Sequence, residues 1–403
     1  MKDLHYKEWT REMASITFLF GAGADSLFEL ADGGNFATSV IGADSAKYEK
    51  SIVEYYKGLN VEWYPPFNLS YWKMEDLLKA SIRKQLLTEE VFKTQKQYAS
   101  AVNMRFEKLK NQKKKAGKQI HAYTSYMGIL DEHFHTLINP IVLGPKKFWR
   151  VVMCYARAYC CLTAKMLPLD QKNKYELLLE KPKKVLDWMK KYANDLNSQK
   201  PNYYNAVKEI KEQHTGFEFH VISSNYTTLC QSIIGLNDKD IAYIHGRIGW
   251  FESARDLKVY DVANEDIPSG DVVFPYLFIQ SGVKPIVDTR QITEYTKMIQ
   301  FLNEAESTLI IVGYCLNADD NHLNSIIRSY LLDGNHVIYF SYKEKYNDES
   351  EKEKRVDILK RLRITENNLE KPINFTLRHI DRETSINDFK ATVLGVLEGP
   401  INA

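Results

Sequence analysis

Residues 16–30 read ITFLFGAGADSLFEL, and this stretch decides the expected fold. The apolar run Ile16–Phe20 ends at Gly21-Ala22-Gly23, and residues with helical spacing follow from Asp25. This order is typical of a strand, a glycine turn and a helix. Glycine lets the backbone approach a ligand closely, and the first turn of a helix offers N–H groups to a phosphate. The stretch therefore predicts a nucleotide-binding turn, with a turn that binds nothing as an equal alternative.

Later apolar runs predict the rest of a sheet. Strands are expected at 217–223, 241–244, 309–312, 337–341 and 375–379. Helical patterns at 291–305 and 322–332 separate the later runs. Strands that alternate with helices favour an α/β fold, with a Rossmann-like, mainly parallel sheet and helices on both faces.

The middle of the chain has a different pattern. From about residue 47 to 215 the apolar residues recur with helical spacing, as in Met74, Leu77, Leu78 and Ile82, and no succession of strands is evident. Because the first strand must pair with distant ones, we interpret this region as a large helical insertion. The predicted organisation is a first Rossmann part at 1–46, the insertion at 47–215, and the remainder at 216–403 with a C-terminal strand and helix.

Composition excludes several classes of protein. The 403 residues carry a net charge of +2, and 44% are hydrophobic, so neither a disordered chain nor a polyelectrolyte binder is expected. Six lysines and one acid within 107–118 are typical of a solvated surface rather than a nucleic-acid site. The run 151–167 is interrupted by Arg157 and Lys165, which favours a buried helix over a membrane span.

The cysteines and the N-terminus bear on location. There are five cysteines, an odd number, and none has CxxC spacing. This argues against a disulfide framework and against a structural zinc site. The first residues show no signal-peptide pattern, so we expect a reduced, cytoplasmic protein.

Polar motifs follow several of the predicted strands. Besides the glycine turn, they are Ser223–Thr227, His245-Gly246 and Gly313–His322. In doubly wound sheets, ligands bind beyond the carboxyl ends of the strands. These motifs are therefore predicted to converge on one crevice.

The order of these motifs resembles that of the sirtuins. Gly21–Gly23, Asn225, His245-Gly246 and Gly313–Asp320 match in order, and Phe274-Pro275 and Lys284-Pro285 lie between them. The chain is more closely similar to the sirtuin-like NAD-cleaving effectors of bacterial antiphage defence. The resemblance covers about residues 15–45 and 217–342, and it does not extend to the predicted insertion.

Two departures from the deacetylase sirtuins change what the resemblance implies. The Pro-Asp-Phe-Arg segment of those enzymes is absent after Asp25, and so are their two zinc-binding CxxC pairs. Protein deacylation is therefore disfavoured. The resemblance implies an NAD+ glycohydrolase that uses NAD+ as its substrate, releases nicotinamide and ADP-ribose, and depletes NAD+ during abortive infection.

Two residues are predicted to be catalytic. His245 suits a general base because imidazole titrates near neutral pH. The Asn225 amide has both a donor and an acceptor, with which it could orient water and bind ribose hydroxyls. The residues predicted to bind the cofactor are Gly21, Ala22, Gly23, Asp25, Gly246, Gly313, Tyr314, Asp319 and Asp320.

No metal is expected. Nicotinamide leaves without Lewis-acid help, and His133 and His135 lack further ligands at suitable spacing. Asp319 and Asp320 could accept adenosine ribose hydroxyls or cap the following helix. A divalent cation at these aspartates is an open alternative, but no set of further ligands is identified for it.

Two other functions remain open at the level of sequence. One is a non-catalytic sensor or scaffold that binds NAD+ or ADP-ribose, and the other is an NAD-dependent protein deacylase. An unregulated NADase would kill its host. A homo-oligomer, or a complex with a partner subunit such as a translocase ATPase or another phage sensor, is therefore expected.

Overall fold

The computed structural model describes part of the 403-residue chain. The described residues are 15–28, 100, 104, 182–197, 201–253, 258–268, 273–278, 288–304, 307–317, 320–342, 350–366, 369, 372–381 and 385–398. Most of the predicted insertion lies outside this set, as do His133, His135, Lys284, Pro285 and Asp319.

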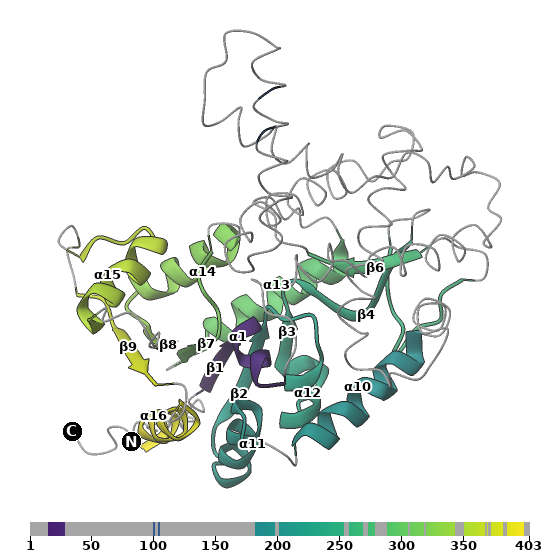
Figure 1. The fold of residues 1–403 in the computed structure, drawn as a ribbon, viewed down its shortest axis with the longest axis horizontal. Helices are drawn as coiled ribbons and strands as arrows, with labels where there is room; N and C mark the ends of the chain where they lie inside the picture. Colours follow the sequence, from purple (N-terminus) through teal and green to yellow (C-terminus); the bar gives the residue numbers. More distant parts are fainter. Residues whose placement is uncertain are drawn as a thin grey trace, which may run out of the picture.

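A six-stranded parallel sheet organises the molecule, in the order β3-β2-β1-β7-β8-β9 (Figure 1). Its strands are β1 (Ser15–Phe20), β2 (Glu218–Ser223), β3 (Ile241–Tyr243), β7 (Thr308–Val312), β8 (His336–Tyr342) and β9 (Phe375–Ile380). Each predicted strand is confirmed to within about two residues. The predicted Rossmann-like, mainly parallel α/β fold is also confirmed.

Alternate residues of the strands point into two separate hydrophobic cores. In β1, Phe18 and Phe20 belong to one core and Leu19 to the other. In β7, Ile310 and Ile311 are divided in the same way. This is the two-residue period of a strand that is covered on both faces, and it explains why these strands read as continuous apolar runs.

Helices cover both faces of the sheet (Figure 1). The Phe18 core includes residues of α10 (Pro182–Asn197), α11 (Tyr203–Gln213), α12 (Leu229–Ile234) and α16 (Ser385–Glu398). The Leu19 core includes residues of α13 (Thr289–Leu302), α14 (Asn321–Leu332) and α15 (Glu351–Arg361). The predicted helices at 291–305 and 322–332 correspond to α13 and α14.

The end predicted for the insertion needs correction. The insertion was predicted to run to residue 215, but α10 and α11 pack on the sheet. Val185 of α10 and Tyr204 of α11 are fully buried in the Phe18 core. Both helices are amphipathic, and a helical pattern alone does not show which domain a helix covers. They belong to the layered α/β domain.

A small antiparallel sheet was not predicted. It has the order β5-β4-β6, formed by β5 (Val259–Asp261), β4 (Gly246–Ser253) and β6 (Val273–Leu277). All eight residues of β4 are buried, so the strand lacks the polar alternation of a half-exposed strand. Pro275 lies in β6, which is an edge strand of this sheet, where a missing N–H is tolerated.

Short helical turns adjoin two of the parallel strands. β1 continues into α1 (Ala22–Asp25) and η1 (Ser26–Phe28), and η3 (Asp238–Asp240) precedes β3.

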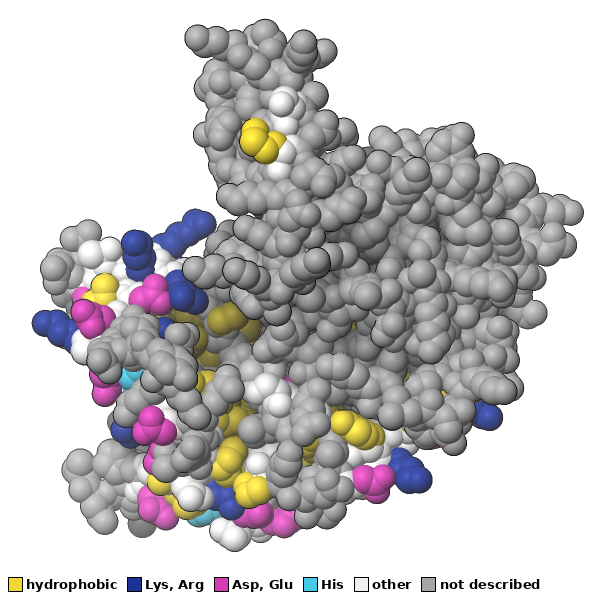
Figure 2. Space-filling view, viewed as in Figure 1, with side chains coloured by type: hydrophobic (Ala, Val, Ile, Leu, Met, Phe, Trp, Pro, Cys, Tyr) yellow, Lys and Arg dark blue, Asp and Glu magenta, His cyan; other side chains and the backbone are white. Residues whose placement is uncertain are grey.

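On the face shown in Figure 2, basic and acidic side chains are interspersed over the described surface. Among the described residues, no helix has the length and apolar character needed to cross a bilayer.

Candidate active site at the carboxyl ends of the strands

The predicted motifs meet where the parallel strands end. Gly21 follows β1, Asn225 lies two residues beyond β2, His245 lies two residues beyond β3, and Gly313 follows β7. Since these four strands are neighbours in the sheet, their carboxyl ends lie along one edge. The structure therefore brings together residues that are up to about 300 positions apart in the chain.

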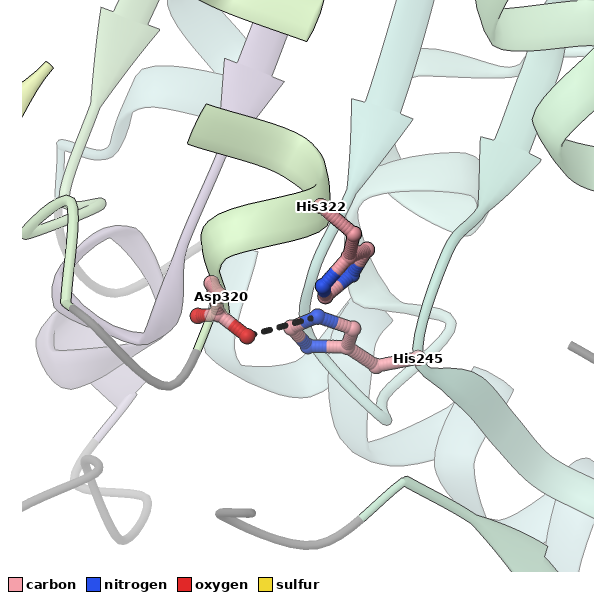
Figure 3. A group of neighbouring side chains, drawn as sticks. All are labelled: His245, Asp320 and His322. Atoms are coloured by element: carbon pink, nitrogen blue, oxygen red, sulfur yellow. Dashed lines mark ion pairs between the residues drawn. The ribbon is translucent and has the colours of Figure 1, made fainter. Parts of the chain in front are cut away.

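His245 lies between a backbone carbonyl and a carboxylate. Its Nδ1 is 3.2 Å from the carbonyl oxygen of Ser224, and its Nε2 is 3.2 Å from Oδ1 of Asp320 (Figure 3). A carbonyl oxygen only accepts hydrogen bonds, so Nδ1 carries a proton. In the neutral imidazole, Nε2 is then the basic nitrogen. The residue is only 6% exposed, so this arrangement is shielded from bulk water.

Asn225 is fixed by contacts of its amide nitrogen. Nδ2 donates to the carbonyl oxygen of Gly21 at 3.1 Å and to the hydroxyl of Tyr204 at 3.4 Å. The side chain is buried, with 5% of the residue exposed. With the nitrogen used inside the protein, the amide has one orientation. Its carbonyl oxygen is the atom suited to meet a ligand hydroxyl or a water.

Asp25 helps to hold Asn225 in place, because Tyr204 is hydrogen-bonded to both side chains. Tyr204 donates a short hydrogen bond to one carboxylate oxygen of Asp25, and Thr227 donates to the other at 2.5 Å. Burial raises the pKa of Asp25 to about 6, against the lowering effect of hydrogen bonds from Thr227, Tyr204 and Asn225. Asp25 was predicted to contact the cofactor. Because both of its oxygens accept hydrogen bonds within the protein, we assign it a positioning role instead.

The glycine turn is packed against the loop after β7. Gly21 donates its backbone N–H to Val312, and Gly23 donates to Gly313 at 2.9 Å. A Cβ on Gly21 would lie 2.5 Å from the Gly313 oxygen, and one on Gly313 would lie 2.2 Å from the backbone nitrogen of Ala24. These glycines are therefore required by the contact between two loops. Ala22 lies in the same turn and is partly exposed.

Two further predicted ligand contacts have structural roles as well. Gly246 has φ +77°, and a Cβ there would lie 2.4 Å from the carbonyl oxygen of Tyr276. Tyr314 is 5% exposed, and its hydroxyl donates to Oδ1 of Asn324 at 3.0 Å. Packing alone is therefore enough to account for glycine at position 246 and tyrosine at position 314.

Asp320 does not cap α14 through its side chain, although it occupies the N-cap position. Its carboxylate faces His245 instead. The turn that precedes it is fixed by the Asn324 amide, which donates to the Asn317 carbonyl oxygen at 2.8 Å. Of the two aspartates considered from the sequence, Asp320 therefore joins the site, and Asp319 lies outside the described residues.

Sequence reasoning missed two residues of this site. Tyr204 comes from α11, a helix that was assigned to the insertion. His322 lies in the first turn of α14, and its ring centroid is 5.9 Å from that of His245 (Figure 3). The spacing Asp320-x-His322 at a helix start was the available signal, but the partner, His245, is distant in the sequence.

Two cysteines belong to the described residues, and each lies near an aspartate of this site. Cys230 is buried, and burial raises the pKa of its thiol to about 12, as expected for an inert side chain. Cys315 is exposed in the loop after β7.

A cavity of about 370 Å³ lies elsewhere, between the small sheet and α13. Tyr243, Trp250, Arg247 and Arg290 are among its lining residues. None of the residues predicted to bind NAD+ lines it. The cations are paired within the protein, as in the contact of Arg247 with Asp261 at 2.5 Å.

Comparisons with known proteins give only distant similarity. No family model and no curated protein matches the chain. Among solved structures, it is similar to a Sir2 homologue in complex with NAD, at 14% identity over 55% of this chain and 75% of that one, with a TM-score of 0.31. It is also similar to Sir2Tm bound to a propionylated peptide, at 18% identity over 58% and 87% of the two chains, with a TM-score of 0.28. These values leave function to be argued from the residues themselves.

Proposed function

We propose that this chain is an NAD+ glycohydrolase that cleaves NAD+ to nicotinamide and ADP-ribose. The observation that carries the proposal is the position of His245 between Ser224 and Asp320, with Asn225 beyond the neighbouring strand, at the shared carboxyl edge of the sheet. The order of the sequence motifs resembles that of NAD-cleaving defence effectors, and it supports the same substrate. On that resemblance we extend the proposal to antiphage defence by NAD+ depletion.

The proposed reaction requires little from the protein. Nicotinamide is a cationic leaving group that becomes neutral as it departs, so no acid has to protonate it. The transition state at the ribose carbon is oxocarbenium-like, as in glycoside hydrolysis. The protein must hold the ribose, exclude bulk water and activate one water.

His245 would act as the general base. Nε2 takes a proton from the attacking water, and the bond from Nδ1 to the Ser224 carbonyl holds the ring in the correct tautomer. The Asp320 carboxylate, 3.2 Å from Nε2, would stabilise the imidazolium that forms. The Asn225 carbonyl oxygen would accept a hydrogen bond from the water or from a ribose hydroxyl.

The buried state of these groups agrees with low basal activity. His245 is 6% exposed and Asn225 is 5% exposed, so a substrate has to displace whatever covers them. We expect activity to depend on assembly with a second copy or a partner subunit. Light scattering at several concentrations, together with rate measurements, tests this. A monomer that is fully active at every concentration would contradict it.

The deciding experiment is incubation of the purified chain with NAD+ and chromatographic separation of the products. The proposal expects nicotinamide and ADP-ribose in equal amounts without any acylated peptide. Turnover only with an acylated peptide would indicate a deacylase. Saturable binding of NAD+ without products, also under conditions that promote assembly, would indicate a sensor.

A further inference from the structure

The histidine–aspartate cluster, formed by His245, Asp320 and His322, has the composition of a metal site. One ligand atom from each residue lies within 4.8 Å of those of the others (Figure 3). Two ligand atoms on a tetrahedral ion lie about 3.4 Å apart, because zinc bonds to histidine and carboxylate are about 2.0–2.2 Å long. The separation of 3.2 Å between Nε2 of His245 and Oδ1 of Asp320 already matches this value.

The hydrogen bonding of His245 fits the same interpretation. Nδ1 faces the carbonyl oxygen of Ser224, and metal-binding histidines usually donate their other ring N–H to such a group. Nε2 faces a carboxylate oxygen, and these two electron-rich atoms repel each other unless a proton, a donor such as the attacking water, or a cation lies between them. A proton would satisfy His245 and Asp320 alone. A divalent cation would also make use of the second imidazole, that of His322.

The cluster is held in place by its surroundings. Asp320 and His322 belong to the start of α14, where Tyr314 donates to Asn324 and Asn324 donates to the Asn317 carbonyl. Tyr295 of α13 packs beside the cluster, with its ring centroid 5.7 Å from that of His322. His245 and Asp320 are buried, whereas His322 is partly exposed and offers a path for an ion. Ligands that are already positioned lose little entropy when a metal binds.

The donor set selects the kind of ion. Two imidazole nitrogens and one carboxylate suit zinc and similar first-row transition metals, whereas magnesium and calcium prefer oxygen ligands. Three protein ligands also leave a fourth position for water.

We propose that His245, Asp320 and His322 bind a divalent transition-metal ion of the zinc class, and that this ion inhibits NAD+ cleavage. The inhibitory part rests on the proposed function, because the ion would occupy Nε2 of His245, the atom that acts as the base. The apo protein is the active form in this scheme. Zinc release would then switch the enzyme on.

A second histidine cluster serves as an internal control. The amino-end cluster, formed by Glu218, His220 and Glu304, also has ligand atoms within 4.8 Å of one another. It has one imidazole instead of two, and Glu218 is exposed. We expect it to bind zinc much more weakly.

The test uses the full chain freed of metal, with Zn2+ as the probe. Binding is measured by competition with a chromophoric chelator, and the melting temperature is followed with and without Zn2+, since an ion that binds only the folded state raises it. The wild-type chain should bind one Zn2+ tightly. The variant His322→Gln should lose at least about 100-fold in affinity together with the melting shift, and His220→Gln should lose neither.

Activity separates the two parts of the proposal. In each variant the rate with Zn2+ is divided by its own rate without Zn2+, and only His322→Gln should become insensitive. Absence of tight Zn2+ binding by the wild-type chain, or binding that depends on His220 instead of His322, would overturn the metal site. Tight binding without inhibition of a measurable NADase would overturn the switch. Tight binding that depends on His322, with no NADase activity in the apo protein, would support the metal site and overturn the proposed function.

Discussion

The two ends of the six-stranded sheet each carry a histidine beside carboxylates, but the surroundings of the two imidazoles differ. At the carboxyl end, His245 lies between the Ser224 carbonyl and Asp320, whose side chain is 13% exposed. At the amino end, His220 lies 3.0 Å from Glu304, whose side chain is 30% exposed, and its ring stacks on Phe301 at 4.3 Å. The same residue types thus form a candidate site at one end and a packed hydrogen-bonded pair at the other.

The two histidines differ because one lies within a strand and the other lies in a loop. His220 is a strand residue, and its ring fills space against α13, so its position is dictated by packing. His245 lies beyond β3 and meets residues from the loops after β2 and β7. Functional groups on loops that a rigid sheet positions are the usual arrangement in α/β enzymes.

The largest expected effect compares these two histidines directly. His245→Ala should lower the rate of NAD+ cleavage by at least about 100-fold, because a general base contributes about 10²–10⁴ in rate. His220→Ala should change the rate by less than about threefold at a temperature where it is folded. Rates are measured by nicotinamide release, with circular dichroism to check folding. Equal losses of cleavage rate in the two folded variants would mean that His245 has no catalytic role that His220 lacks.

A second comparison concerns glycines at the two ends. Gly313 follows β7 with φ +69°, and a Cβ there would meet the backbone of Gly23 and Ala24. Gly334 precedes β8 with φ +93°, and a Cβ there would meet nothing within 4 Å. Gly313→Ala combines backbone strain with a collision and should cost about 2–4 kcal/mol of unfolding free energy, whereas Gly334→Ala adds only strain, about 1 kcal/mol.

Denaturant unfolding of the two variants measures this difference. If Gly313→Ala were as stable as Gly334→Ala, the loops after β1 and β7 would not be in the close contact that the structure describes. The candidate site would then be less rigid than the amino end of the sheet.

The third prediction concerns Asp25 and pH. Its pKa of about 6 in the folded chain exceeds the ordinary value of 3.8, so between these values the folded state binds more protons than the unfolded state. The contribution of this group to stability is therefore present at low pH and is lost as the pH rises from about 4 to about 6. Asp25→Asn cannot ionise, so it removes this loss. Relative to wild type, it should gain about 2–3 kcal/mol between pH 4 and pH 7.

Unfolding free energies at pH 4, 5, 6, 7 and 8 check the Asp25 prediction. The stability of Asp25→Asn relative to wild type should rise between pH 4 and about pH 7 and stay constant above it. Parallel curves over the whole range would mean that the pKa of Asp25 is the same in the folded and unfolded states. The hydrogen bonds from Tyr204 and Thr227 would then offset the cost of burial.

Much of the fold could be predicted from the sequence, because the parallel strands are buried on both faces. Runs such as Ile16–Phe20 and Leu309–Val312 are apolar throughout, and each corresponds to a strand of the sheet. The antiparallel sheet escaped prediction because β5 has three residues and β4 lacks alternation. The helices α10 and α11 were placed in the wrong unit, because amphipathicity does not identify the partner surface.

The site was predictable only in part, and for a physical reason. His245, Asn225 and Asp320 could be found because each follows an apolar run, which marks a strand end. Tyr204 lies on an amphipathic helix, where a polar side chain gives no sign of what it faces. His322 ends the predicted motif Gly313–His322, but its partner, His245, is distant in the sequence. The turn glycines were predicted because glycine allows the backbone to approach a neighbour closely. Gly21 and Gly23 approach the loop after β7 in this way, and the sequence does not distinguish such a contact from one with a ligand.

The smallest expected effect is that of a chelator on the metal-free chain. Catalysis as proposed uses the Nε2 atom of His245 and needs no ion, so EDTA added to metal-free protein should change neither NAD+ cleavage nor the melting temperature. The amino end of the sheet offers no strong competing site among the described residues, so added metal should act at the carboxyl end. Activity that appears only when magnesium or manganese is added to the metal-free protein would mean that Asp320 holds a cation beside the diphosphate. Activity that appears only when zinc is added would mean that the histidine–aspartate cluster works with its metal, and it would reverse the proposed switch.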